Sequence, residues 1–342
     1  MALAAPSVPS RAMAQLVSGS EHIEQAVAEL HASRPVVIPT ETVYGLAAPT
    51  FDERAIEAVF RLKGRPMDNP LIAHVVDAAA ARQVVASWDD RADRLAAACW
   101  PGPLTLVLPK ASGVPSLATG GRCTVAVRAP DHPVAQSLLK AFGGAISAPS
   151  ANRSGCVSPT QASHVISDYA DVPEASSLLV LDGGACSRGV ESTVLDLTTE
   201  HPRILRVGTI SAQTIASIIG RIQEAPLPQH QTHSPGTQSR HYAPQTPTEL
   251  IDGADVASRL AGSCGTQCVF GPAGTDVQPP HVFMERPPDP TAAEACLYAQ
   301  LRAADVLSLT CLLIVLPPDE PQWSTIRDRL TRAAAPRNAT RG

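Results

Sequence analysis

The sequence has few aromatic residues, no excess of positive charge and no long apolar run. Phe, Trp and Tyr make up 4% of its 342 residues, which argues against a nucleic-acid platform built from many stacked rings. The formal net charge of −5 argues against a chain that coats nucleic acid by bulk attraction. No segment approaches the roughly 20 apolar residues that cross a bilayer, and the first dozen residues lack the apolar core of a secretory signal. We therefore expect a soluble protein without a membrane partner.

Short metal and nucleotide motifs are missing as well. The eight cysteines include no CxxC pair, and the one close pair, Cys264 and Cys268, has no second pair or histidine cluster to complete a zinc site. The sequence therefore predicts no metal site, and scattered thiols fit a reduced, cytoplasmic compartment. Neither a GxxxxGK phosphate loop nor a GxGxxG fingerprint occurs. A nucleotide would have to be held by another device.

What is present predicts two α/β domains, because 342 residues exceed what one hydrophobic core usually organises. Apolar strands and helices interleave over 13–222, which indicates a first domain with a mixed, largely covered sheet. Residues 223–248 are rich in proline and show no period, so they are expected to form a linker. A smaller α/β domain is expected over 249–335. We expect 1–12 and 336–342 to be disordered tails, with Met1 or Met13 as the start.

The periodicity of apolar residues places the main elements. Helical spacing predicts helices over 20–30, 53–63, 92–100, 211–222 and 323–335. Apolar or alternating segments predict strands within 35–40, 70–76, 103–109, 122–130, 178–184, 192–198, 203–208 and 311–317.

The stretch "RLKGRPMDNP" sets Lys63 and Arg65 around a glycine and follows them with two X-Pro steps. In an extended segment the two side chains would point to one face, and the prolines would restrict the residues before them. Two cations on one face suit the oxygens of a polyphosphate. A solvated helix end, where cations complement the helix dipole, fits the segment equally well.

Four further stretches carry polar side chains among small or apolar ones. "SAPSANRSG" offers Ser150 and Asn152 on a backbone that a ligand could approach closely, although an ordinary Ser-rich loop has the same composition. Period-two alternation aligns Thr124 with Arg128, which could clamp a carboxylate or face solvent. His74 interrupts an apolar strand, as hydrogen-bonded core histidines often do. The linker stretch "SPGTQSRHYAP" indicates a loop that docks on another surface.

Taken together, "PTETVYGLAAPTFDERAIEAVFRLKGRPMDNPLIAHV", "WPGPLTLVLP", "SAPSANRSG", "ESTVLDL" and "ILRVGTIS" resemble the threonylcarbamoyl-AMP synthase (YrdC-like) family over the first ~210 residues. "SPGTQSRHYAP" and the trailing domain resemble the long, two-domain form. The resemblance implies a twisted mixed sheet with helices around a concave basic cavity, plus a smaller C-terminal, Rossmann-like α/β domain. It also implies a nucleotidyltransferase that makes threonylcarbamoyl-adenylate and pyrophosphate from L-threonine, bicarbonate and ATP with Mg²⁺. A tRNA threonylcarbamoyl-transfer complex would then pass the group to an adenosine beside the anticodon, and a weak direct contact with tRNA is an expectation.

The resemblance assigns roles residue by residue. The implied catalytic signature is Lys63, Arg65, Ser150 and Asn152. The implied ATP contacts are Arg65, Asn69, Thr124, Ser150, Ser158, Arg206 and Tyr242, the last acting as a lid. The implied L-threonine contacts are Thr42, His74, Arg128, Ala148 (through its backbone) and Ser192. This chain departs from the family around Gln238 and Ser239, where a bulky or basic residue is usual, so closure over the nucleotide could differ.

Two other functions compete with this reading. An RNA-binding module of the same pathway, without adenylyl transfer of its own, would bind RNA in a salt-sensitive way without ATP. A carbamoyl transferase of hydrogenase maturation would resemble a much longer chain with acylphosphatase and zinc-finger regions, and neither region occurs in this sequence.

Overall fold

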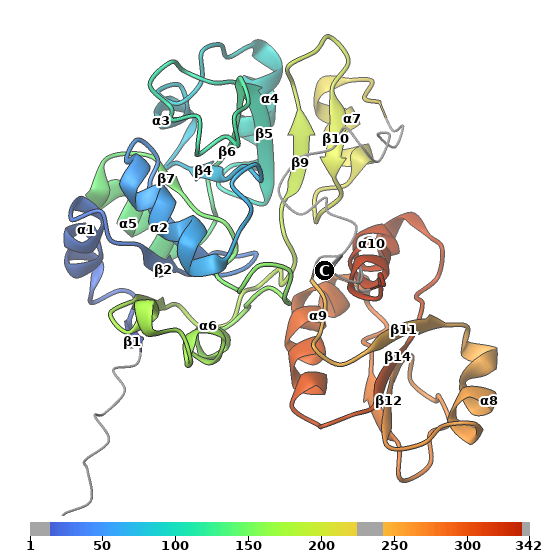
Figure 1. Ribbon diagram of the computed structural model, residues 1–342. Coiled ribbons are helices and arrows are strands. Elements are labelled where there is room, and N and C mark those ends of the chain that lie inside the picture. The colour runs from blue at the N-terminus through green and yellow to red at the C-terminus, as the bar shows by residue number, and fades with distance from the viewer. Residues whose placement is uncertain (1–13, 224–241, 337–342) are drawn as a thin grey trace, which may run out of the picture.

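Two sheets organise the molecule in the computed structural model, which describes residues 14–223 and 242–336. Apart from Pro336, the predicted tails lie outside the described residues, as does most of the predicted linker. Figure 1 shows a large first domain and a smaller second domain, with helices α9 and α10 of the second domain on the side that faces the first. The predicted pair of α/β domains is thus confirmed. Within the described residues, no helix is both long and apolar enough to span a membrane.

A ten-stranded mixed sheet forms the first domain, in the order β1-β8-β2-β3-β7-β4-β6-β5-β9-β10. The strands β2, β4 and β5 lie within ranges predicted from apolar patterning, whereas β1 was not predicted. Their bounds are β1 Gln15–Ser18, β2 Val36–Ile38, β3 Gly45–Pro49, β4 Ile72–His74, β5 Leu104–Pro109, β6 Thr124–Arg128, β7 Ile146–Ser147, β8 Leu179–Asp182, β9 Thr193–Asp196 and β10 Arg203–Arg206.

Seven α-helices and one 3₁₀ turn accompany this sheet in the described part of the first domain. Four of the helices correspond to predicted ones, and α5 and α6 were not predicted. Their bounds are α1 Ile23–His31, α2 Glu53–Lys63, α3 Ala78–Ala81, α4 Asp90–Cys99, α5 Pro133–Phe142, α6 Ala162–Tyr169, η1 Pro173–Ala175 and α7 Ala212–Ile219.

Helix α2 has the bounds that its sequence predicts. The Asp52 side chain accepts from the backbone N–H of Arg54 and Ala55 at its start, and Gly64 ends it with a φ of 63° that glycine adopts without strain. Lys63 is therefore the last helical residue. The expected extended geometry of the segment from Lys63 to Arg65 is wrong, because the helix continues to the glycine and sends the two side chains to different partners.

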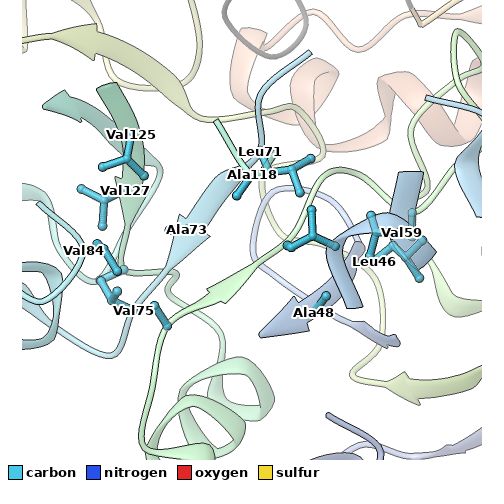
Figure 2. Close-up of a cluster of buried hydrophobic side chains, with 14 of the residues drawn as sticks. Leu46, Ala48, Val59, Leu71, Ala73, Val75, Val84, Ala118, Val125 and Val127 are labelled. Atoms are coloured by element: carbon cyan, nitrogen blue, oxygen red, sulfur yellow. The ribbon is translucent and has the colours of Figure 1, made fainter. Parts of the chain in front are cut away.

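The core of the first domain covers both faces of its central strands. Figure 2 shows Leu46 and Val59 packed beside one another in this buried cluster, with Val125 and Val127 of β6 in another part of it. The opposite face of β6 is covered too, since Ala126 is 6% and Arg128 3% exposed. Arg128 is consequently a buried arginine, and the solvent-facing alternative is excluded.

The second domain contains a parallel sheet of four strands in the order β11-β14-β12-β13. Helix α8 lies on the side away from the first domain (Figure 1). The bounds are β11 Thr248–Ile251, η2 Gly253–Asp255, α8 Val256–Ala261, β12 Gln267–Gly271, β13 Val282–Glu285, α9 Pro290–Asp305, β14 Cys311–Val315, η3 Pro321–Trp323 and α10 Ser324–Ala333. A parallel sheet with helices on its faces agrees with the expected small α/β unit.

Both ends of the predicted linker are packed rather than free. The N–H of Gln223 donates to the carbonyl of Pro202 at 2.8 Å, which joins this residue to the first domain. At the other end, the N–H groups of Gln245 and Thr246 donate to the Asp305 carboxylate at 3.0 and 2.8 Å. The segment after residue 241 is thereby attached to helix α9.

Candidate active site

A cavity opens where the ends of several strands of the first domain meet the segment that begins at Tyr242. It brings together many of the residues that the sequence singled out. Its lining is Thr40, Thr42, Val43, Gly45, Arg65, Pro70, Leu71, Ile72, His74, Arg128, Ala148, Pro149, Ser150, Glu191, Arg206 and Tyr242. Six predicted residues are not part of this lining, and they are Lys63, Asn69, Thr124, Asn152, Ser158 and Ser192.

Lys63 holds the Ser-rich loop through hydrogen bonds to the loop backbone. Its ammonium donates to the carbonyl of Ser150 and, at 2.5 Å, to that of Asn152. Burial lowers the pKa of Lys63 well below its usual value, and the nearby charge of Arg65 lowers it further. The Asn152 amide donates to the carbonyls of Arg153 at 2.7 Å and Cys156 at 2.8 Å. Lys63 and Asn152 thus fix the loop that presents Ser150, and a direct phosphate contact from Lys63 stays a prediction.

Arg65 lines the cavity and is held by the proline segment that follows it. Its Nε donates to the Asn69 carbonyl at 3.1 Å and its Nη2 to the Pro70 carbonyl at 2.9 Å. Burial lowers the pKa of Arg65 to about 10, so the guanidinium remains charged at neutral pH. It forms no ion pair with a carboxylate among the described residues. The backbone carbonyls of Asn69 and Pro70 therefore fix the orientation of a buried positive charge.

A second arginine, Arg206, enters the lining from the end of β10. Its Nε donates to the Ser192 carbonyl and its Nη2 to the Ser192 hydroxyl, both at 3.0 Å. The Ser192 hydroxyl lies 2.7 Å from that of Thr105. Ser192 is fully buried, so it orients Arg206 from beneath the cavity surface.

A third arginine, Arg128, forms a buried ion pair that the sequence did not predict. Its Nη2 lies 2.5 Å from a carboxylate oxygen of Glu41, while its Nη1 donates to the Thr42 hydroxyl at 2.9 Å and its Nε to the Gly102 carbonyl at 3.2 Å. The Thr40 hydroxyl accepts from the N–H of Thr42 and shapes this turn. Arg128 Nη2 and both Glu41 oxygens are buried without a well-directed hydrogen bond in the described part of the chain. The pair therefore retains capacity to bind a ligand.

The same ion pair separates two hollows. Arg128 lines the cavity, whereas Glu41 lines a second, more open hollow together with Trp100, Asp131 and Arg188. Each hollow is thus bounded by one member of the pair.

His74 is a neutral member of the cavity lining. Its Nδ1 lies 3.1 Å from the Ile72 carbonyl, and because a carbonyl only accepts, Nδ1 carries the proton and Nε2 is left as an acceptor. Burial lowers the pKa of His74 to about 3, with a further contribution from Arg128. The imidazole therefore stays uncharged throughout the physiological range.

Of the remaining predicted residues, Ser158 and Thr124 lie around the cavity, whereas Ala148 lies in its lining. Ser158 is buried and its hydroxyl donates to Glu191 at 2.8 Å. Thr124 is half-buried at the start of β6, opposite Pro109 in the register of the sheet. The peptide of Ala148 lies in the wall, where Gly45 approaches so closely that an added Cβ would lie 3.1 Å from the Ala148 Cβ.

Sequence reasoning missed four charged or polar residues of this region. Glu41 and Glu191 lie inside the quoted segments "PTETVYGL" and "ESTVLDL", so their position in apolar surroundings was the available signal. Tyr298 and Arg329 belong to the second domain and donate to Glu191 at 2.7 and 3.0 Å. Nothing local in the sequence connects them with a site more than a hundred residues away.

The lining carries three arginines and a single carboxylate, which itself is paired with a fourth arginine. Such a cavity favours anionic ligands, since burial strengthens each charge interaction relative to water. In the described residues, no group of three or more His, Cys, Asp or Glu side chains could hold a metal ion.

Comparison with known proteins covers both domains. Residues 28–208 match the Sua5, YciO and YrdC family model, described as "telomere recombination", and residues 210–335 match the model described as "threonylcarbamoyl-AMP synthase, C-terminal domain". The threonylcarbamoyl-AMP synthase of Pyrococcus abyssi is 41% identical over 250 residues, which is 70% of this chain and 72% of that protein. The one from Schizosaccharomyces pombe is 32% identical over 350 residues, covering 88% of this chain and 85% of the relative.

Solved structures extend the likeness to three dimensions. P. abyssi Sua5 in complex with L-threonine matches with a TM-score of 0.83 and 33% identity over 93% of this chain and 95% of that one. A double variant of the same protein matches with a TM-score of 0.84 and 32% identity, over 94% and 96% of the two chains. Both domains and their relative arrangement are therefore shared with a solved protein.

Proposed function

The chain belongs to the threonylcarbamoyl-AMP synthase family, and we propose that its arginine-lined cavity joins L-threonine, bicarbonate and ATP with release of pyrophosphate. Its activity is the synthesis of threonylcarbamoyl-AMP, a nucleotidyl transfer that serves tRNA modification. The alternative of an RNA-binding module without adenylyl transfer receives no support from these relatives.

The observation that carries the proposal is the set of three buried guanidinium groups facing one cavity, Arg65, Arg128 and Arg206. The amine of threonine attacks the carbon of bicarbonate and the elements of water leave, which gives a carbamate. A carbamate oxygen then attacks the α-phosphorus, and the bond to the β-phosphate oxygen breaks. Both reactants are anions, so a site that offsets their repulsion and holds them in line supplies most of the acceleration.

For L-threonine, the carboxylate partner in this proposal is Arg128. Its guanidinium has five N–H groups. Its hydrogen bonds to Gly102 and Thr42 use two of them, and its Nη2 also lies 2.5 Å from a carboxylate oxygen of Glu41. Nε2 of His74 is an acceptor suited to the threonine hydroxyl. The Thr42 hydroxyl and the peptide of Ala148 border the same part of the lining. In P. abyssi Sua5, L-threonine is present in a solved complex.

For ATP, the phosphates are proposed to lie against Arg65 and Arg206, beside Ser150. Removal of water from such a site strengthens the attraction of each arginine for the phosphates. Mg²⁺ is proposed to enter with the triphosphate. Glu191, the one carboxylate in the lining, already accepts from three side chains, so phosphate and water oxygens would hold the ion.

Pyrophosphate release tests the proposal directly. The complete mixture of ATP, Mg²⁺, L-threonine and bicarbonate should release pyrophosphate, and omission of either threonine or bicarbonate should reduce the rate to background. Release that continues without threonine would indicate a plain ATPase and would overturn the proposal.

A further inference from the structure

Glu191 places a negative charge in the wall of a cavity proposed to bind a polyanion. Glu191 is 6% exposed and lines the cavity together with Arg65 and Arg206. A bare carboxylate there would repel nucleotide phosphates and weaken the attraction of the two arginines. The protein must therefore neutralise Glu191 for the cavity to bind ATP.

Most of that neutralisation comes from the second domain. Glu191 Oε1 accepts from the Ser158 hydroxyl at 2.8 Å, and Oε2 accepts from Tyr298 at 2.7 Å and from Nε of Arg329 at 3.0 Å. Tyr298 on α9 and Arg329 on α10 are both 0% exposed. Burial by itself would raise the pKa of Glu191, but the charges of Arg329 and Arg206 outweigh it and lower the pKa to about 2. The carboxylate is thus ionised and matched by a buried cation.

The same two residues also fix the aromatic wall of the cavity. The rings of Tyr242 and Tyr298 stack with centroids 5.4 Å apart, and the Arg329 guanidinium lies 5.1 Å from the Tyr242 centroid. Arg329 is held in turn by Asp328 at 2.5 Å and by the Val207 carbonyl at 2.8 Å. One arginine therefore contacts both a charged and an aromatic member of the cavity lining.

We propose that Arg329 of the second domain is a positioning residue for ATP, because it neutralises Glu191 and holds Tyr242 in the cavity wall. The inference rests on the proposed binding of ATP in this cavity. It gives the second domain a defined part in the reaction. Its side chains balance the charge of Glu191 and complete the wall of the nucleotide site. Arg329 acts through Glu191 and Tyr242 rather than by touching the nucleotide.

A different contact between the domains provides the matched control. The guanidinium of Arg302 on α9 forms an ion pair with Asp168 at 2.6 Å and donates to the Ser158 carbonyl at 3.3 Å. Neither Arg302 nor Asp168 lines the cavity. The domains also approach closely at a point away from Arg329, since a Cβ added at Gly189 would lie 2.3 Å from the Ala295 carbonyl oxygen of α9.

The experiment compares full-length wild type with Arg329→Met, Glu191→Gln/Arg329→Met and Asp168→Asn. Steady-state pyrophosphate release gives KM for ATP and for L-threonine, and calorimetric titration with a non-hydrolysable ATP analogue gives affinity without turnover. A hydrogen bond between charged groups corresponds to at least about a tenfold change in an equilibrium constant. Arg329→Met should therefore weaken ATP at least about tenfold and leave KM for threonine within about twofold.

Two comparisons separate this role from simple stabilisation of the domain contact. The double variant should recover most of the ATP affinity, because neutral Gln needs no counter-charge, whereas Asp168→Asn should lower Tm without changing KM for ATP. Equal ATP affinity in wild type and Arg329→Met, an equal loss in Asp168→Asn, or no recovery in the double variant would each overturn the proposal.

A milder variant covers the case in which Arg329→Met does not fold. Tyr298→Phe removes one donor to Glu191 and retains the ring that stacks on Tyr242, so it should fold and bind the ATP analogue about threefold to tenfold more weakly. Unchanged affinity in this variant would overturn the proposal. If wild type binds the analogue but releases no pyrophosphate with threonine and bicarbonate, the proposed function fails while the positioning role is still measured by calorimetry.

Discussion

The variant Glu41→Gln is predicted to destabilise the protein and to make its stability depend more strongly on L-threonine. The Glu41 and Arg128 side chains are each 4% exposed, and their closest N and O atoms are 2.5 Å apart. Gln preserves the shape of the side chain and removes its charge. A buried guanidinium is then left without a counter-charge in the unliganded protein.

The expected magnitude follows from the burial of the pair. Removing one partner of a buried ion pair costs about 3–5 kcal/mol, and at ~2–4 °C per kcal/mol for a domain of this size Tm should fall on the order of 10 °C. When threonine binds at Arg128 its carboxylate supplies the missing charge. Saturating threonine should therefore raise Tm more in Glu41→Gln than in wild type.

Thermal unfolding with and without L-threonine checks this prediction, in the absence of ATP. Threonine amide, which lacks the carboxylate, should not reproduce the larger stabilisation. Glu29→Gln serves as the control variant because it breaks an exposed pair with Arg34, for which a change below about 1 kcal/mol is expected. Equal threonine-induced shifts in wild type and Glu41→Gln would refute the assignment of Arg128 to the threonine carboxylate.

Three further outcomes are expected. Arg65→Ala should abolish threonylcarbamoyl-AMP formation with little change in the circular dichroism spectrum, and wild-type turnover would contradict its assignment. Lys63→Met should lower the free energy of unfolding by about 2 kcal/mol, because the carbonyls of Ser150 and Asn152 lose their donor. Urea denaturation measures this difference, and unchanged stability would mean that Lys63 does not hold the loop. Burial raises the pKa of Glu294 from 4.5 to about 7, so the folded state binds its proton more tightly than the unfolded state. The free energy of unfolding should then fall as pH rises from about 4.5 to 7, by at most ~1.4 kcal/mol per pH unit from this group. Glu294→Gln should remove this contribution in denaturation series at pH 5, 6 and 7. An identical slope in the variant would contradict the raised pKa of Glu294.

Local sequence signals determined the elements that carry their own boundaries. Helix α2 begins after Asp52 and ends at Gly64 as predicted, because an N-cap and a left-handed glycine act within one turn of the chain. The short strands β2, β4 and β5 were predictable from apolar patterning, which is also a local signal. Helices α5 and α6 and strand β13 were not predicted from the sequence.

The cationic character of the cavity could also be anticipated, since Arg65 and Arg206 lie in segments that match the family, Arg128 was singled out by its alternation with Thr124, and all three line the cavity. Their partners could not be anticipated. Whether Arg128 faced solvent or the interior depended on the sheet being covered on both faces, and the sequence left these alternatives open. Its pairing with Glu41 appears only when β6 is placed beside the turn before β3.

By itself, the sequence determined the ends of helix α2, the α/β pattern and the presence of cations near a Ser-rich loop, because these depend on neighbours within a few residues. Only the tertiary structure decided which group each charged side chain contacts. Lys63 donates to carbonyls 87 and 89 residues away, and Arg329 meets Glu191 across 138 residues and a domain boundary. Buried charges are stable only with a partner, and the folded chain, rather than the local pattern, selects that partner.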